Sequence, residues 1–226
     1  MSKDEISAEL HRIAKVPAPD PFNFSVLKVE TRREPDTEGY NTTSMKISLI
    51  ARIGVTEFET FTIDATNHRH TQEPIEVVSV SPLLGTIIDD EDILPTFDIY
   101  ATAIESHLAD KICAMYEPHP SGASNRYHDL ADIITIIQTQ DFSAAKLSQT
   151  LSHESARRGI VLPRELTAPS RSWQSHYEKH ASSFTSLPAD LRSLEASLSF
   201  ADNCINPILE GTITAKHWNH VDRNWQ

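Results

Sequence analysis

The sequence predicts an α+β protein in which a strand-rich half precedes an all-helical half. Up to residue 97, several segments alternate apolar and polar side chains, which is the period of a strand. Beyond residue 97, apolar residues recur every three or four positions, which is the period of a helix with one buried side. Runs of strands followed by runs of helices are typical of the α+β class. We therefore expect a strand-rich subdomain at 1–97 and a helical subdomain at 98–226.

The strand-rich subdomain is expected to open with a short helix at 3–15, because Ile6, Leu10 and Ile13 share one side of a helix. Three prolines between positions 17 and 21 end this helix. The alternating segments that follow predict strands around 22–26, 45–51, 55–66 and 75–80, with a polar turn region at 31–41.

The helical subdomain is expected to end in a tail without clear periodicity. We expect this tail, residues 207–226, to pack over the helices through Trp218 and Trp225. Trp173 and Tyr177 lie on one helical stripe, and we interpret them as core residues rather than as a platform for stacking bases. The helices are predicted at about 98–117, 125–140, 143–157, 170–183 and 189–206.

Composition favours a soluble, cytoplasmic protein. Of 226 residues, 39% are hydrophobic, which is ample for a core, and no apolar run approaches the ~20 residues that cross a bilayer. The N-terminus lacks the apolar segment of a signal peptide. There are two cysteines, Cys113 and Cys204; the first lies in an apolar helical run, so a disulfide framework is not expected.

The formal net charge of −12 argues against indiscriminate binding to nucleic acid, which needs a dense positive surface. It leaves room for a local basic groove. The candidates are Arg32-Arg33 and Arg157-Arg158, with Arg164 and Arg171, and we interpret them as ordinary solvated charges.

Two elements near the middle of the chain carry polar residues that packing alone does not require. Lys111 ends a short apolar helical run, and a loop separates it from Arg126, Asp129 and Asp132. Positions three apart stack on one side of a helix, so the last three residues share a side. The same helix takes its buried side from other residues, namely Leu130, Ile133, Ile134 and Ile137. The polar side therefore indicates a functional site.

These two elements resemble the AbiEii/AbiGii family of nucleotidyltransferase-like toxins. Members carry a hydrophobic–Ala–Glu–Lys–hydrophobic helix, a loop, and then Arg-x-x-Asp-Leu-x-Asp. In this chain the elements read Leu108-Ala109-Asp110-Lys111-Ile112 and Arg126-Tyr127-His128-Asp129-Leu130-Ala131-Asp132. The resemblance implies a nucleotidyltransferase-like sheet followed by helices, and a toxin of a toxin–antitoxin or abortive-infection system. It also implies NTP and Mg²⁺ as cofactors, an RNA acceptor such as tRNA, and an antitoxin partner.

The same resemblance assigns roles to individual residues. Asp64, near the end of an alternating strand, would hold the metal ion, and Lys111 would contact the nucleotide phosphates together with Arg126. Asp129 would orient Lys111 or act as a base, whereas Asp132 is expected to be structural. The alternatives are plain: Asp64 as a strand terminator, Lys111 as a surface lysine, and Asp129 as an exposed acid paired with Arg126.

Strand alternation places Asp64 on one face with Phe58, Thr60 and Thr62. The family's Gly-Ser or Gly-Gly turn and its Asp-x-Asp pair have no counterpart between Met1 and Asp64, as if the chain entered the family pattern partway. Asp90 and Asp92 form an Asp-x-Asp, but they lie later, between turn signals, and we interpret them as a solvated acidic loop.

The chain has fewer candidate carboxylates than a two-metal site needs. We therefore expect little or no activity if this chain is the whole protein. The competing hypothesis is a catalytically inactive remnant, or a binding module that keeps the fold and pairs with an antitoxin or another chain. A sheet edge left exposed by the missing strands would favour such pairing.

Overall fold

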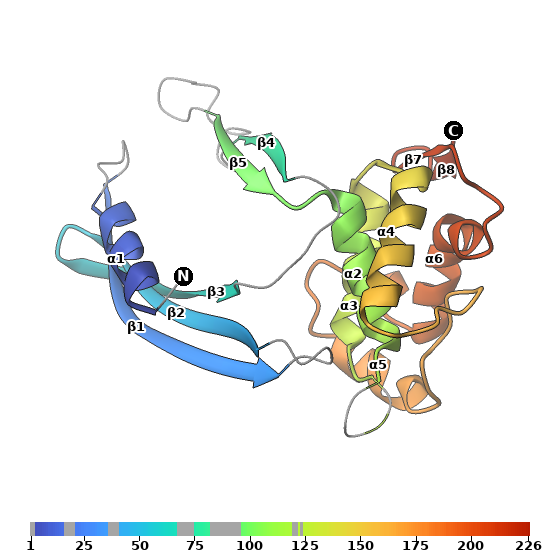
Figure 1. Ribbon diagram of the computed structural model, residues 1–226, viewed down its shortest axis with the longest axis horizontal. Coiled ribbons are helices and arrows are strands. Elements are labelled where there is room, and N and C mark those ends of the chain that lie inside the picture. The colour runs from blue at the N-terminus through green and yellow to red at the C-terminus, as the bar shows by residue number, and fades with distance from the viewer. Residues whose placement is uncertain are drawn as a thin grey trace. The chain divides into compact units, whose positions relative to one another are not determined.

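The computed structural model forms two compact units, one made of Met1–His70 and Val80–Phe97 and the other of Thr71–Ser79 and Asp98–Gln226 (Figure 1). Antiparallel sheets come before the main helices, so the predicted α+β class, with a sheet region followed by a helical region, is confirmed. Asp90 and Asp92 lie outside the described residues. The structure describes residues 3–15, 21–35, 41–66, 75–81, 96–118, 122 and 124–226.

The first unit is a helix packed on a three-stranded antiparallel sheet of order β1-β2-β3. The polar turn predicted at 31–41 is wrong for most of its length, because strand pairing continues through Glu34↔Thr42 and Pro35↔Asn41. Ladder hydrogen bonds join backbone groups, so a strand can run on beyond its apolar pattern. The elements are α1 (Lys3–Ile13), β1 (Phe22–Pro35), β2 (Asn41–Ile53) and β3 (Thr56–Thr66).

One face of this sheet is apolar, and α1 covers part of it. Ile6 of α1 is buried with Met45, Ile47 and Leu49 of β2. The opposite face holds Asp64, which is exposed and pairs in register with Lys46. Because successive strand residues alternate between faces, Asp64 faces away from the apolar side.

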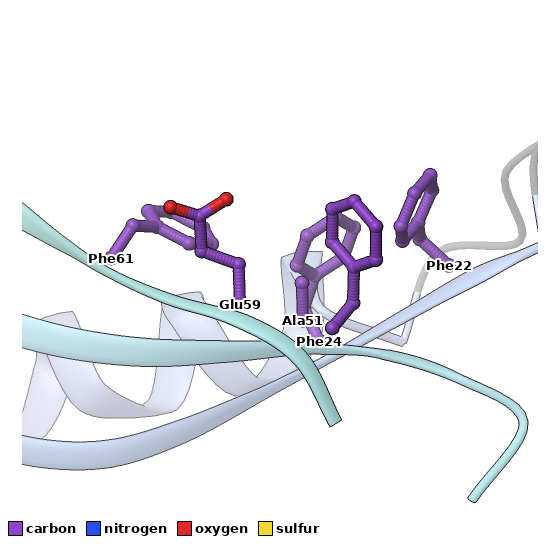
Figure 2. A pocket seen from close by; sticks show the side chains of 6 residues that line it. Phe22, Phe24, Ala51, Glu59 and Phe61 are labelled. Atoms are coloured by element: carbon purple, nitrogen blue, oxygen red, sulfur yellow. The ribbon is translucent and has the colours of Figure 1, made fainter. Parts of the chain in front are cut away.

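Phe58 does not share a face with Asp64, contrary to the alternation prediction. The β2–β3 register shifts beside Ala51, whose partner is Glu59, whereas the next β2 residue pairs with Glu57. The extra residue on β3 reverses the alternation there. The Phe58 ring therefore meets Phe22 on the apolar face, with ring centroids 5.2 Å apart. Figure 2 shows this end of the sheet, where a pocket of about 360 Å³ is lined by Phe22, Phe24, Ala51, Phe58, Glu59 and Phe61.

A two-stranded sheet joins β4 (Glu76–Val80) to β5 (Phe97–Ala101). Residues 98–101 were predicted to begin a helix, and this is wrong. Ile99 and Tyr100 are residue types that favour strands, and both are exposed, so no helical side would be buried here.

The second unit is a helical bundle with one continuous core. The predicted helices at 125–140 and 143–157 are confirmed, the one at 98–117 begins later, at Ile104, and the last begins as a short 3₁₀ turn. Trp173 and Tyr177 are fully buried, which confirms that they belong to the core. The helices are α2 (Ile104–Tyr116), α3 (Tyr127–Thr139), α4 (Ala144–Arg157), α5 (Trp173–Ala181), η2 (Ala189–Leu191) and α6 (Leu194–Leu209).

The C-terminal tail packs over the helices through its tryptophans, as expected, and it also forms strands. A small sheet of order β6-β7-β8 joins β6 (Phe142–Ser143) to β7 (His217–Asn219) and β8 (Asn224–Trp225). The indole N–H of Trp218 donates to the carbonyl of Ile137 at 2.9 Å.

Both cysteines are buried and free, in agreement with the expectation that no disulfide framework exists. In the part of the chain that the structure describes, no helix has the length and apolar character needed to span a membrane.

Replacing Trp218 by Ala is expected to lower the free energy of unfolding by about 3–5 kcal/mol, because a buried aromatic side chain and its hydrogen bond are lost. Trp218 is 3% exposed. Urea unfolding monitored by circular dichroism measures the change. Val221, 75% exposed in the same tail, is the matched control, and Val221→Ala should shift stability by less than about 0.5 kcal/mol. Equal effects of the two changes would contradict the packing role of Trp218.

Candidate functional site

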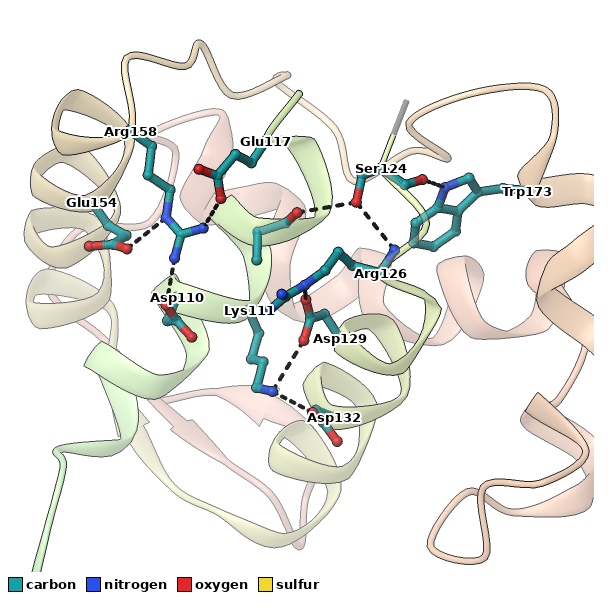
Figure 3. A network of polar contacts seen from close by, with 11 residues as sticks. Asp110, Lys111, Glu117, Ser124, Arg126, Asp129, Asp132, Glu154, Arg158 and Trp173 are labelled. Atoms are coloured by element: carbon teal, nitrogen blue, oxygen red, sulfur yellow. Dashed lines mark hydrogen bonds and ion pairs between the residues drawn. The ribbon is translucent and has the colours of Figure 1, made fainter. Parts of the chain in front are cut away.

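The lysine and the two aspartates of the sequence motif meet between α2 and α3 (Figure 3). The Lys111 Nζ lies 3.1 Å from the Asp129 Oδ1 and 2.6 Å from the Asp132 Oδ2. Lys111 comes from the middle of α2, whereas both aspartates come from the first two turns of α3. The two helices pack side by side, so residues 18 positions apart in the chain come into contact.

Asp129 is the most enclosed member of this group, with its side chain 4% exposed. Its second oxygen accepts a hydrogen bond from the Arg126 Nε at 2.7 Å. It lies in the first turn of α3, where the positive end of the helix dipole also favours a carboxylate. Asp129 is therefore not the exposed acid of the alternative interpretation, but a buried anion between two cations.

Lys111 is held as an ammonium. Its burial lowers the pKa, but the hydrogen bond to Asp132 and the charges of both aspartates outweigh that effect, so its pKa is raised above the ordinary value. Its side chain is 18% exposed, so Lys111 is not an ordinary surface lysine. Arg126 is more open, at 53%, and only its Nε edge faces Asp129.

Ser124, which the sequence analysis missed, fixes the start of α3. Its hydroxyl donates to the carbonyl of Ala114 at 3.3 Å and accepts from the backbone N–H of Arg126 at 3.3 Å. Its own carbonyl accepts from the indole of Trp173 at 2.7 Å. Figure 3 shows the contacts that join Ser124 to Arg126 and to Trp173. The only sequence signal was a serine shortly before a helix start, which is common at many helices.

Arg158 is not a solvated charge, contrary to the sequence interpretation. Its side chain is 9% exposed and contacts three carboxylates on two helices and a following loop. The Arg158 Nη2 lies 2.6 Å from Asp110, its Nε lies 2.7 Å from Glu154, and its Nη1 contacts Glu117. Asp110 is the residue before Lys111, so α2 is held by ionic contacts to α3 on one side and to α4 on the other.

Lys111, Arg126 and Asp129 are brought together in one unit, and Asp64 belongs to the other unit. Among the described residues, no three side chains of the types that bind metals are grouped. Asp64 offers one exposed carboxylate, which fits only a metal ion whose remaining ligands are phosphate oxygens and water.

The geometry is that of a charged site at the junction of two helices, and these helices follow a sheet region along the chain. Residues 1–201 match the family described as the nucleotidyl transferase AbiEii toxin of type IV toxin–antitoxin systems, and the chain belongs to this family. Membership in a toxin–antitoxin family implies an antitoxin partner. No curated protein matches the chain significantly.

We expect Asp129→Ala to lower the free energy of unfolding by about 2–4 kcal/mol, because two cations would lose their buried partner. Asp132 is 44% exposed, so Asp132→Ala should cost about 0–1 kcal/mol. Urea unfolding of the two variants compares a buried with an open carboxylate on the same lysine. Equal losses would show that Asp129 is not the anchor of the site.

Glu154 predicts a pH dependence of stability. Burial raises its pKa, but hydrogen bonds from Arg157 and Arg158 outweigh this and lower the pKa from 4.5 to about 2. The unfolded chain therefore takes up the proton first as the pH falls. The contribution of Glu154, roughly 2–3 kcal/mol after solvent screening, is present above pH ~4.5 and lost between pH ~4.5 and ~2.

Unfolding free energies at about pH 6 and about pH 3 should differ less for Glu154→Gln than for the unchanged protein. Glu165 is exposed and has no ion pair among the described residues, so Glu165→Gln is the matched control. If Glu154→Gln kept the full pH dependence, the ionised Glu154 would not stabilise the folded chain.

Proposed function

We propose that the chain is a toxin that transfers nucleotides from NTP to an acceptor such as tRNA. Family membership supports the class of activity. The observation that carries the proposal is the Lys111 ammonium, held beside the open guanidinium of Arg126 by the buried Asp129. Two cations fixed at one point suit a triphosphate, whose negative charge must be neutralised during nucleotidyl transfer.

Lys111 can be held and still bind phosphate. An ammonium has three N–H donors, and two of them point to Asp129 and Asp132. The third is available to a phosphate oxygen. Asp132 is the more exposed partner, so a phosphate can also displace it without uncovering a buried charge. Asp129 then orients the lysine, which is one of the two roles, orientation or base, that the resemblance implies.

Mg²⁺ enters the proposal through Asp64. This ion is commonly bound by one or two protein carboxylates together with substrate phosphates and water, and it supplies charge neutralisation of the triphosphate. Asp64 lies on the polar face of the sheet with its carboxylate exposed, and Lys46 is its partner on the neighbouring strand. We assign Asp64 as the carboxylate that this chain offers to the ion.

A second function has support of a different kind. Phe58 and Phe61 on the sheet of the first unit are 62% and 38% exposed, and exposed apolar clusters mark surfaces that bind proteins. We keep as the alternative a catalytically inactive member that retains the fold and pairs with an antitoxin or with another chain.

Lys111→Ala should lower nucleotide transfer by about 100-fold or more, because a charge that stabilises the transition state is lost. The assay incubates the purified chain with Mg²⁺, radiolabelled NTPs and bulk tRNA, and follows label in RNA. Lys146→Ala is the matched control, since Lys146 is a half-exposed lysine on α4 of the same unit. Its transfer rate should equal that of the unchanged protein.

Thermal unfolding separates loss of chemistry from loss of fold. Lys111→Ala is expected to stay folded at the assay temperature, because Arg126 still pairs with Asp129. Activity that survives Lys111→Ala would remove this residue from the site. A chain that transfers no label but arrests growth when produced in cells, with Lys111→Ala arresting growth equally, would favour the binding function.

A further inference from the structure

Two histidines of α5 stack on a tyrosine at the start of α3. The ring of Tyr127 is nearly parallel to that of His180, with centroids 4.9 Å apart and planes at 21°. His176 lies at 6.4 Å from the same ring, with planes at 8°. Tyr127 is buried, whereas both histidines are exposed. The buried Tyr127 ring thus supports the two imidazole rings from the protein side, and the histidines are exposed to solvent.

Basic side chains surround these stacked rings. Lys179 lies three positions after His176, so it shares that histidine's side of α5. His128, next to Tyr127, is exposed and packs on the ring of Phe184 at 4.0 Å. Arg126 begins the same turn of α3 and turns only one edge to Asp129. We call these five residues the histidine surface: Arg126, His128, His176, Lys179 and His180.

The histidine surface contrasts with the rest of a chain whose formal charge is −12. Glu178 is the acidic residue of α5, and it lies two positions from both stacked histidines, so it points to another side of the helix. Among the described residues, neither Lys179 nor His180 has a carboxylate partner. The surface therefore combines donors for phosphates with flat rings for bases.

The histidine surface borders the Lys111 site through the first turn of α3. Tyr127 and Asp129 are two positions apart, so one side chain meets α5 and the other meets α2. Arg126 belongs to both groups, since its Nε binds Asp129 and its terminal nitrogens have no partner among the described residues.

We infer that the histidine surface binds the single-stranded end of the RNA acceptor. This inference rests on the proposed function. Proteins bind unpaired RNA by stacking bases on aromatic, histidine or arginine side chains and by pairing phosphates with basic ones. Stacking on imidazole does not depend on base identity, so the surface recognises an exposed end rather than a sequence.

The test measures binding of a fluorescently labelled single-stranded RNA to the full chain by anisotropy, without NTP. Replacing both histidines (His176→Ala with His180→Ala) should weaken RNA binding about tenfold, because stacked bases lose their platform. Lys179→Glu should weaken it by a similar factor and make the salt dependence shallower by roughly one phosphate contact. Lys146→Glu, on α4, is the charge-matched control and should bind as tightly as the unchanged protein.

Thermal unfolding confirms that each variant is folded. Lys179 is exposed, so Lys179→Glu keeps the test decisive even where the double histidine change disturbs Tyr127. RNA affinity that is equal for Lys179→Glu, Lys146→Glu and the unchanged protein would overturn the inference, as would a chain that binds no RNA.

The two proposals fail in different ways. If nucleotide transfer required Lys111 but the acceptor were not RNA, the RNA-binding role of the histidine surface would be overturned. The assignment of the chain as a transferase would stand. If RNA binding required the histidine surface but no label were transferred, the RNA-binding inference would be supported and the proposed transferase activity would be rejected.

Discussion

The helical unit depends on one buried carboxylate. Asp129 is almost fully enclosed, and it accepts hydrogen bonds from Lys111 of α2 and from Arg126 at the start of its own helix. An ionised group is costly to bury unless it is paired and hydrogen-bonded, so the positions of both cations follow from that of Asp129. The site between α2 and α3 and the path of the chain into α3 are fixed by the same contact.

A second ionic cluster restrains α2 from the opposite side. Asp110 and Lys111 are neighbours in sequence, and successive residues of a helix point in directions about 100° apart. Asp110 pairs with Arg158, which also pairs with Glu154 of α4. Rotating or sliding α2 would break contacts with both neighbouring helices. Removing one partner from such a cluster would leave its other charges unpaired, which is costly, so these contacts restrict α2 to one arrangement.

The parts of this structure that sequence predicts are those with a local signal. Helical periodicity locates α3 and α4, and the spacing of Arg126, Asp129 and Asp132 places these side chains on one side of α3. That Lys111 meets Asp129 follows once the two motif elements are taken as neighbours. The metal role of Asp64 stays a prediction, because Asp64 lies in the other unit.

The remainder depends on contacts that no local pattern encodes. Asp110 and Arg158 are 48 positions apart, so no local pattern around the Arg157-Arg158 pair indicates that Arg158 is buried. The bulge that turns Phe58 to the apolar face arises from the pairing of β2 with β3. A prediction from strict alternation of side chains assumes that no such extra residue is present. Short strands such as β7 and β8 are defined by their partners and by Trp218, not by their own composition.

The difference between the two aspartates explains how a lysine can be both fixed and available. The side chain of Asp129 is 4% exposed and that of Asp132 is 44% exposed, although both contact the same ammonium. In the proposed function, an incoming phosphate would compete with the open carboxylate, which water can solvate once it is released, and would leave the buried one in place. Arg126, anchored by one edge to the same Asp129, can then serve a phosphate of either the nucleotide or the acceptor. The buried carboxylate thereby sets where the two substrates of the proposed reaction meet.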